Sequence, residues 1–507
     1  MKFEDQNKKT LMSLTSSLIA MLLSIAINFV LSPYIVENFG EEANGFTQLA
    51  NNFINYATLI TVALNSMAGR FITVAYCKGN YDECKKYYSS VLVGNIIIIA
   101  VLLVPAVLFS IRLDDFLNVE TSVVSHVKLL FALVFANFFV SQVNGVFSIA
   151  FYVKNSQYLQ NAVNMIRTVI NAGGLLILFS AFTPKIYYVS LVAVILSCAL
   201  CPVFLIYKKK LLPDISFDIK FFDIKAVWTM VSSGLWNTVT QCGNLLMTGL
   251  DLLLSNLFIS PVQMGVLSVA KTIPNTIIQL GATVNTNFSP NLTIAYAEGD
   301  KNKILYSLRY AMKCSSILTC IPIVILCVYG IEFYSLWVPS MDASQLTFLS
   351  FLSCVTFIPL GGPQVLFNVF TTTNRLKVNS ISVLVGGVVN FVVVFLLLKY
   401  TDLGLIAVAG VSSVVSIIRN LLITIPYSAK LLQLKWYVFY RDVLQSCVLS
   451  ALVFAVCLLA KKIIQPNGWF SLVCSIVCSG IISVVVAVVV MMNASERKLL
   501  FNKIRRK

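Results

Sequence analysis

Three basic side chains and one acidic side chain fall inside long apolar runs of this 507-residue chain. The basic residues are Arg167, Lys271 and Arg419, and the acid is Asp251. A charge at the middle of a membrane helix costs at least about 2.5–3.5 kcal/mol, so such residues have a function or a partner. Lys offers a point charge and Arg a two-pronged donor, and both suit phosphate oxygens. We therefore predict that Lys271 and Arg167 attract an anionic group, specifically a diphosphate.

Each of these charges has a structural alternative. For Lys271 and Arg167 the alternative is an ion pair with a buried carboxylate. Asp251 either balances Lys271 or binds a coupling proton or cation. Arg419 lies close to the end of its apolar run, so its side chain is expected to reach the inner membrane surface. Pro274, three residues after Lys271, is expected to kink the helix and free backbone carbonyls.

Polar residues also form stripes along two of the apolar segments. Spacings of three and four residues place each stripe on one face of a helix. An unpaired amide or hydroxyl in an apolar medium costs about 2–7 kcal/mol, so a long stripe cannot face lipid. It either bonds to neighbouring helices or lines a watery cavity that solvates sugar hydroxyls, and its recurrence in two segments favours the cavity. The candidate substrate-binding residues in the stripes are Asn51, Asn52, Asn55, Thr272, Asn275 and Gln279.

The elements that carry these residues follow from composition. Apolar residues make up 58% of the chain and charged residues 11%, with a mean hydropathy of +0.86, which excludes an ordinary soluble enzyme. Runs of about 20 apolar residues, the length that crosses the bilayer as a helix, recur along the whole chain. We predict an all-α integral membrane protein with about 14 transmembrane helices, over residues 12–35, 45–69, 88–111, 123–149, 158–181, 186–207, 227–256, 263–288, 306–330, 345–370, 378–398, 403–425, 439–460 and 469–492.

The net charge of +16 is explained by orientation. Of the 37 Lys and Arg residues, 28 lie in the N-terminal segment, the even-numbered connections and the C-terminal tail, and 6 lie in the odd-numbered connections. Positive charge concentrates on the cytoplasmic side of membrane proteins. Both termini of this multi-pass protein are therefore predicted to lie in the cytoplasm, with the chain in the bacterial cytoplasmic membrane. The excess charge reports topology, so no nucleic-acid partner is expected.

An internal repeat divides the chain. An offset of 220 residues places 41–82 on 261–302 without a gap, with 8 identities in 42 positions that include Gly45 on Gly265 and Asn55 on Asn275. Six predicted spans separate the copies, so the halves are parallel and pseudo-symmetric. We predict a six-helix bundle over 1–207, a cytoplasmic linker over 208–226, a second six-helix bundle over 227–425, two further helices over 426–492 and a basic tail over 493–507.

Signatures of catalysis and of cofactor binding are missing from the sequence. There is no G-x-x-x-x-G-K-[ST] phosphate loop, and Cys198-x-x-Cys201 has neither a second cysteine pair nor a nearby histidine. The connections between spans are too short to form a catalytic domain. We expect no enzyme activity, no cofactor and no metal.

A family resemblance rests on two matching segments. Residues 65–80 and 285–300 each end in Ala-Tyr-x-x-Gly followed by Asn or Asp. With fourteen short-looped spans in two halves, the chain resembles the MOP superfamily, and most of all its polysaccharide-transport branch, the O-antigen and exopolysaccharide flippases. The resemblance implies two bundles around a central cavity that opens to each side of the membrane in turn.

The function implied by the resemblance is translocation of oligosaccharide repeat units, linked to undecaprenyl diphosphate, for surface polysaccharide synthesis. The implied partners are this lipid-linked substrate, membrane lipids and other polysaccharide assembly proteins. The alternative is a cation-coupled multidrug exporter of the same superfamily. Such an exporter requires acids deep in its cavity, and this chain offers only Asp251, which favours an anionic substrate.

Overall fold

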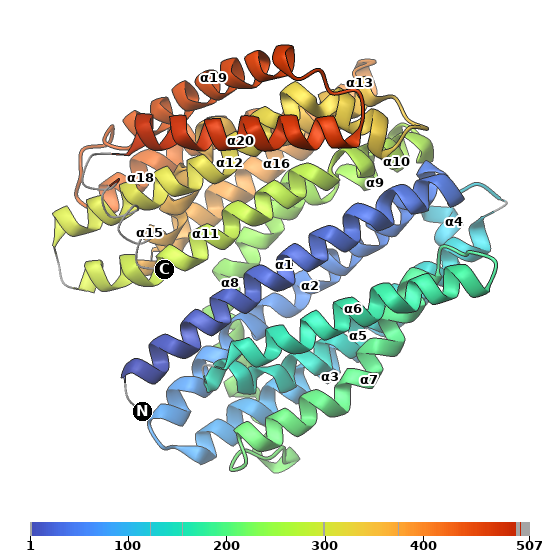
Figure 1. The fold of residues 1–507 in the computed structure, drawn as a ribbon. Helices are drawn as coiled ribbons and strands as arrows, with labels where there is room; N and C mark the ends of the chain where they lie inside the picture. The colour runs from blue at the N-terminus through green and yellow to red at the C-terminus, as the bar shows by residue number, and fades with distance from the viewer. Residues whose placement is uncertain are drawn as a thin grey trace. The chain divides into compact units, whose positions relative to one another are not determined.

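The computed structural model describes residues 3–121, 123–154, 156–297, 300–373, 375–492 and 497, which are helical with short connections and contain no strand (Figure 1). Within the described part of the chain, twelve helices are long and apolar enough to span a membrane. They confirm the expected all-α membrane fold. The two other expected spans, 227–256 and 263–288, are interrupted helices rich in polar residues. Most of the predicted basic tail lies outside the described residues.

The chain forms two compact units. Unit 1 comprises Met1–Leu245 with Ser260–Gly265, and unit 2 comprises Leu246–Ile259 with Val266–Lys507. The expected boundary over 208–226 differs from this division, because the helix that follows it packs within unit 1. The helices of unit 1 are α1 (Phe3–Phe39), α2 (Glu41–Cys77), α3 (Tyr81–Ile111), α4 (Leu113–Phe116), α5 (Val124–Val153), α6 (Gln157–Ala181), α7 (Tyr188–Leu211) and α8 (Ile224–Asn244).

Helix α8 is fixed to unit 1 at its first turn. It packs against α2 and α3. The Asp223 carboxylate caps α8 by accepting from the Lys225 backbone N–H at 2.8 Å and also pairs with Lys86 on α3. Ser90 on α3 hydrogen-bonds to the backbone of Asp223. The hydrogen bond from the Lys86 ammonium lowers the pKa of Asp223 below its usual value. These contacts are local to the connection after α7 and explain why α8 does not begin unit 2.

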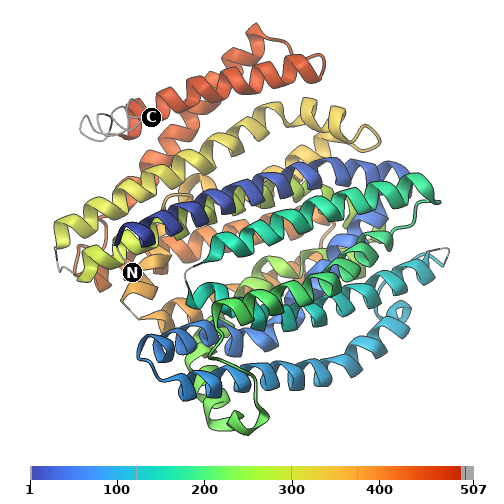
Figure 2. The same cartoon turned by 60° about the horizontal axis from the view of Figure 1, so that its bottom comes forward.

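Unit 2 is organised around its longest helix, α12 (Lys301–Trp337), which packs against α11, α13, α19 and α20 (Figures 1 and 2). The Tyr329 hydroxyl of α12 lies 2.9 Å from the Ser479 hydroxyl of α20 and is buried. The two C-terminal helices, α19 and α20, therefore belong to the core of unit 2. The elements of unit 2 are α9 (Asp251–Phe258), α10 (Pro261–Ala270, shared with unit 1), α11 (Thr272–Ala297), α12, α13 (Ala343–Cys354), α14 (Phe357–Leu360), η3 (Pro363–Leu366), α15 (Phe367–Thr372), α16 (Leu376–Tyr400), α17 (Leu405–Arg419), η4 (Asn420–Thr424), α18 (Ile425–Leu431), α19 (Tyr440–Ile463) and α20 (Trp469–Met491).

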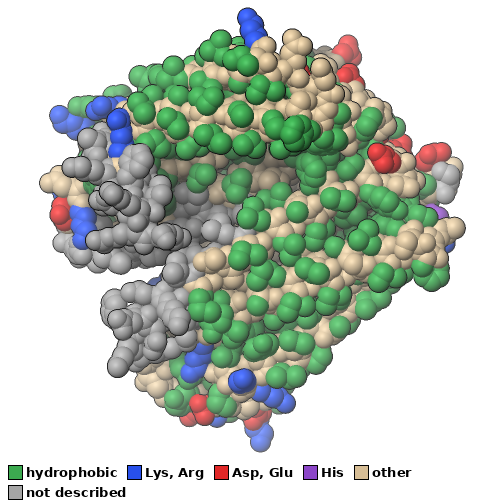
Figure 3. Space-filling model, viewed as in Figure 1, with side chains coloured by type: hydrophobic (Ala, Val, Ile, Leu, Met, Phe, Trp, Pro, Cys, Tyr) green, Lys and Arg blue, Asp and Glu red, His purple; other side chains and the backbone are tan. Residues whose placement is uncertain are grey.

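Large apolar side chains cover the outside of the helices. Phe470 is 84% exposed, and Val101 and Leu176 are about two-thirds exposed. Figure 3 shows green apolar side chains along the helices, with charged side chains gathered towards their ends. A soluble monomer does not expose apolar surface on this scale. The surface is that of a protein surrounded by lipid.

The repeat found in the sequence recurs in the helix boundaries. Helix α2 runs from Glu41 to Cys77, and α10 with α11 runs from Pro261 to Ala297, a shift of 220 residues at both ends. The repeat-equivalent Gly45 and Gly265 lie against each other within unit 1: a Cβ on Gly45 would lie 3.0 Å from the Gly265 Cα atom.

Candidate functional site

The centre of the candidate site is an ion pair inside unit 2. The Lys271 ammonium contacts the Asp251 carboxylate, and the side chains are 14% and 3% exposed. Asp251 begins α9, and Lys271 lies between α10 and α11. The structure thus shows the ion-pair alternative for Lys271. The predicted roles of Lys271 in diphosphate binding and of Asp251 in ion coupling stay predictions.

A helix interruption places Lys271. Pro274 has no N–H to donate to the carbonyl of Ala270, four residues earlier. The Ser350 hydroxyl of α13 donates to this carbonyl at 2.8 Å. In the first copy of the repeat Ile54 replaces Pro274, and α2 is continuous. The proline therefore explains why the helix is interrupted in the second copy of the repeat and continuous in the first.

A second interruption precedes Asp251. Residues Leu245–Gly249 form a π-helical turn, labelled η2, between α8 and α9. The Asn390 side-chain amide of α16 donates to the carbonyls of Met247 at 2.8 Å and of Leu246 at 3.1 Å. Irregular turns within membrane helices require such partners for their backbone groups. Two broken helices, each supported by a side chain of another helix, thus bring the ion pair together.

Arg167 occupies a different environment in unit 1. It lies near the middle of α6, and its Nη2 donates to the Ser197 hydroxyl of α7 at 2.9 Å. The Ser197 hydroxyl in turn donates to the Asn137 side chain of α5 at 2.5 Å. This network satisfies donors of Arg167 with neutral groups and leaves its charge unbalanced. Among the described residues, no carboxylate pairs with it.

Arg419 differs from its sequence-based expectation. The expected span ended at residue 425, but the helical path continues through η4 and α18 to Leu431, so Arg419 does not lie near its end. Its Nε and Nη1 atoms are buried without a hydrogen-bond partner, and Nη2 donates to Asn420 at 3.3 Å. The guanidinium lies 5.8 Å from the ring centre of Phe367. The prediction that Arg419 reaches the membrane surface was therefore wrong, and its donors point into unit 2.

The candidate stripe residues lie on α2 in unit 1 and at the start of α11 in unit 2. Asn51 and Asn55 are exposed, as are Asn275 and Gln279 on α11, whereas Asn52 and Thr272 are half-buried. Asn51 also donates to the Thr47 carbonyl at 3.1 Å, and the Thr272 hydroxyl to the Ser268 carbonyl at 3.1 Å. The role of these amides in a watery path along each helix stays a prediction. The side chain of Thr286, at the far end of the second stripe, lies outside the described residues.

Another buried ionic contact was missed from the sequence. Asp442, in the first turn of α19, is 5% exposed, and its carboxylate lies 3.6 Å from the Arg309 Nε of α12. Lys313, one turn further along α12, is 6% exposed. The charge count places both basic residues in a connection, although they lie within the expected span 306–330; in the structure they lie on α12, which begins at Lys301. The pairing of α12 with α19 was not visible in the sequence.

Comparison with known proteins identifies the family. Residues 8–292, more than half of the chain, match the family described as polysaccharide biosynthesis protein. The chain belongs to this polysaccharide biosynthesis family. It is also 28% identical over 505 residues to the uncharacterized membrane protein EpsK of Bacillus subtilis (strain 168), with 98% of each chain covered.

Solved structures place this family member in the MOP fold, as its sequence predicts. The lipid II flippase MurJ in an inward closed conformation matches with a TM-score of 0.67 and 15% identity, over 94% of this chain and 98% of MurJ. An inward-facing multidrug resistance MATE transporter of the MOP superfamily matches with a TM-score of 0.64 and 13% identity, over 82% of this chain and 94% of the transporter. At these identities the likeness establishes the fold.

Proposed function

We propose that the protein translocates oligosaccharides linked to a polyprenyl diphosphate, undecaprenyl diphosphate in particular, across the cytoplasmic membrane for surface polysaccharide synthesis. The termini lie in the cytoplasm, and transport proceeds by alternating access. The sugar and diphosphate head cannot cross about 30 Å of hydrocarbon unsolvated. A polar path through the protein removes this barrier while the lipid tail stays in the bilayer.

The observation that carries the proposal is the environment of two arginines. Arg167 and Arg419 each lie inside a candidate span, and neither pairs with a carboxylate among the described residues. Two donor nitrogens of Arg419 are buried without a hydrogen-bond partner, and a cation within a membrane span is costly unless an anion balances it. The guanidinium fork matches two oxygens of a phosphate group. Membership of the polysaccharide biosynthesis family supports a diphosphate-linked sugar as this anion.

The polar stripes complete the proposed path. The exposed amides of α2 in unit 1 and of α11 in unit 2 offer donors and acceptors to sugar hydroxyls. Lys271 adds to the attraction of the diphosphate when its bond to Asp251 opens, and protonation of that carboxylate provides coupling to ions. The membrane potential also favours export of an anion, by roughly 2.3 kcal/mol per charge for each 100 mV.

Deletion of the gene tests this function. Cells without the protein should accumulate carrier-linked repeat units on the cytoplasmic face and lose surface glycan, and the wild-type gene should restore it. Normal surface glycan in the deletion strain would rule out the flippase function. Increased drug sensitivity with normal glycan would instead assign the chain to the drug-exporting members of the superfamily.

A further inference from the structure

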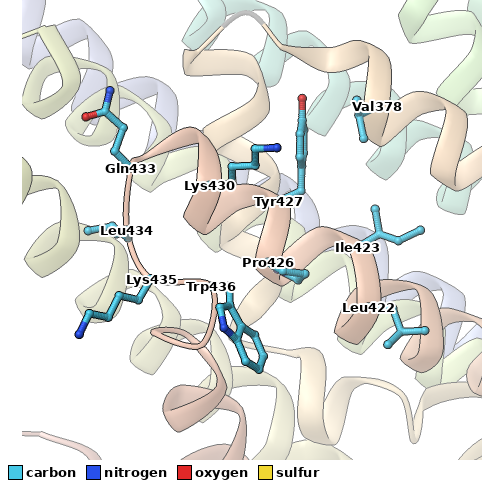
Figure 4. Close-up of a pocket in the computed structure, with 10 residues that line it drawn as sticks. All are labelled: Val378, Leu422, Ile423, Pro426, Tyr427, Lys430, Gln433, Leu434, Lys435 and Trp436. Atoms are coloured by element: carbon cyan, nitrogen blue, oxygen red, sulfur yellow. The ribbon is translucent and has the colours of Figure 1, made fainter.

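None of the charged residues described above lines a hollow in unit 2. It has a volume of about 670 Å³ and is lined by the start of α16, by η4 and α18, and by the connection that follows α18 (Figure 4). Its ten lining residues include two lysines, Lys430 and Lys435, and no acid.

We propose that this hollow binds the headgroup of an anionic phospholipid from the leaflet on the predicted cytoplasmic side. This proposal goes beyond the translocation of an oligosaccharide and does not depend on it. The occupant is a lipid of the surrounding bilayer, bound by its phosphate and by the first part of its acyl chains.

The apolar wall of the hollow fits acyl chains. Leu422 is 70% exposed, and Ile423 and Val378 are more than a third exposed. All three lie within candidate membrane spans, Leu376–Tyr400 or Leu405–Leu431. Their exposed side chains therefore face the apolar part of the bilayer, as the acyl chains of a bound lipid would.

The polar rim fits a phosphate group. Lys430, the penultimate residue of α18, and Lys435 in the following connection are both exposed. Lys430 and Tyr427 are three residues apart and extend to the same side of α18 (Figure 4). Basic residues at the end of a membrane helix attract anionic lipids. A third cation supports the rim, because the Lys301 ammonium donates to the Gln433 side chain at 2.7 Å.

The backbone around the hollow also suits an anion. Helix α16 begins at Leu376 without a side-chain cap, and Val378 in its first turn lines the hollow. The positive end of the α16 dipole therefore lies at the rim. The last carbonyls of α18 are already occupied: Ala429 accepts from the Leu434 N–H at 2.9 Å, and Lys430 from the Gln433 N–H at 3.0 Å. These two carbonyls therefore repel a bound anion only weakly.

An aromatic residue completes the interfacial character of the hollow. Trp436 is 63% exposed, and its ring packs edge-on against Tyr440 at 5.7 Å. The Tyr440 hydroxyl donates to the Leu421 carbonyl within η4 at 2.5 Å, which ties the connection to the lipid-facing helix. Trp and Tyr are concentrated at the level of lipid headgroups. Lys430 and Lys435, which extend to different sides of the connection in Figure 4, would each offer an ammonium group at the depth where lipid phosphates occur.

Lipid titration of the purified full-length protein tests the proposal. We compare binding of phosphatidylglycerol and phosphatidylcholine by native mass spectrometry, with the lipid-induced shift of the unfolding temperature as a second readout. Phosphatidylglycerol should bind more tightly to the wild type. Each lysine near the surface strengthens anionic lipid binding by about 5-fold, so Lys430→Ala with Lys435→Ala should weaken it about 30-fold.

A matched control separates the site from general surface charge. Lys399 is also exposed and lies beside an exposed aromatic residue, Tyr400, but belongs to the other end of α16. Lys399→Ala should change the phosphatidylglycerol affinity by less than twofold. The charge-conserving variant Lys430→Arg/Lys435→Arg, purified as a monodisperse protein, should keep the wild-type affinity. Unchanged affinity in the double alanine variant would overturn the proposal. Displacement of the lipid by inorganic phosphate would also overturn it, because the site would then recognise a free anion.

Discussion

The Lys271 ammonium and the Asp251 carboxylate form a buried ion pair at the interruptions of two helices. Removing one partner of a buried pair costs about 3–5 kcal/mol, because the other charge is left uncompensated. Asp251→Asn alone should therefore lower the unfolding temperature strongly. The double variant Asp251→Asn/Lys271→Met should recover most of the stability, as thermal unfolding in detergent would measure. Equal losses in the single and double variants would contradict the pairing.

The same double variant separates the two roles considered for Lys271. If the lysine acts only within the ion pair, surface glycan should recover together with stability. Lost export at restored stability would assign a transport role beyond the ion pair, either to Lys271 in substrate binding or to Asp251 in ion coupling.

Arg419 should show opposite effects on stability and export. Two of its donor nitrogens are buried without a partner, and each such group costs about 1–3 kcal/mol. Arg419→Met keeps the apolar stem and removes these donors, so the variant should unfold at a higher temperature. Surface glycan should nevertheless fall at unchanged protein level, because the variant lacks the phosphate-binding guanidinium. Normal export in Arg419→Met would remove this residue from the proposed path.

Arg167 and its neighbour Ser197 provide a matched comparison. Arg167→Gln retains hydrogen-bonding groups but removes the charge, and it should reduce export at least 10-fold, the effect of about 1.4 kcal/mol. Ser197→Ala removes a hydroxyl that contacts both Arg167 and Asn137 and should cost about 1 kcal/mol of stability with export preserved. Quantified surface glycan and thermal unfolding measure the two effects. Similar losses of export in both variants would indicate that Arg167 acts through helix packing.

Pro274 and Ser350 should be energetically coupled through the carbonyl of Ala270. In the wild type, Ser350→Ala leaves this carbonyl without a partner and should destabilise the protein by about 1–3 kcal/mol. In a Pro274→Ala background, the backbone N–H of residue 274 can donate to the Ala270 carbonyl. Ser350→Ala should then reduce the stability by about 1 kcal/mol less than it does in the wild type. A double-mutant cycle by thermal unfolding measures the difference. Purely additive effects would contradict the proposed role of Ser350.

The sequence predicts the helices and the repeat well, because both depend on local patterns. Apolar length alone identifies most of the spans, and the 220-residue offset anticipates the matching bounds of α2 and of α10 with α11. The effect of Pro274 was also predictable, since a proline removes a fixed backbone bond. The candidate residue Lys271 was found because a charge within an apolar run is unusual.

Features that depend on tertiary contacts were not predictable. One predicted span ends at residue 425, but in the structure the π-turn η4 precedes α18, whose first turn contains Pro426, and the helical path continues. That continuation changes the environment of Arg419. The placement of α8 in unit 1 depends on side-chain contacts with α2 and α3, which no periodicity reveals. The Asn390 contact with η2 is likewise a long-range pairing.

The most direct test of the proposed function is translocation by purified protein in lipid vesicles. A polyprenyl diphosphate oligosaccharide with a fluorescent label on its sugar is placed in the vesicles, and a membrane-impermeant quencher reports the label on the outer leaflet. Wild-type protein should make nearly all of the label accessible, whereas the double variant Arg167→Gln/Arg419→Met should leave the inner-leaflet fraction protected. Protection that persists with wild-type protein, or equal exposure with the double variant, would contradict the proposed diphosphate-guided translocation.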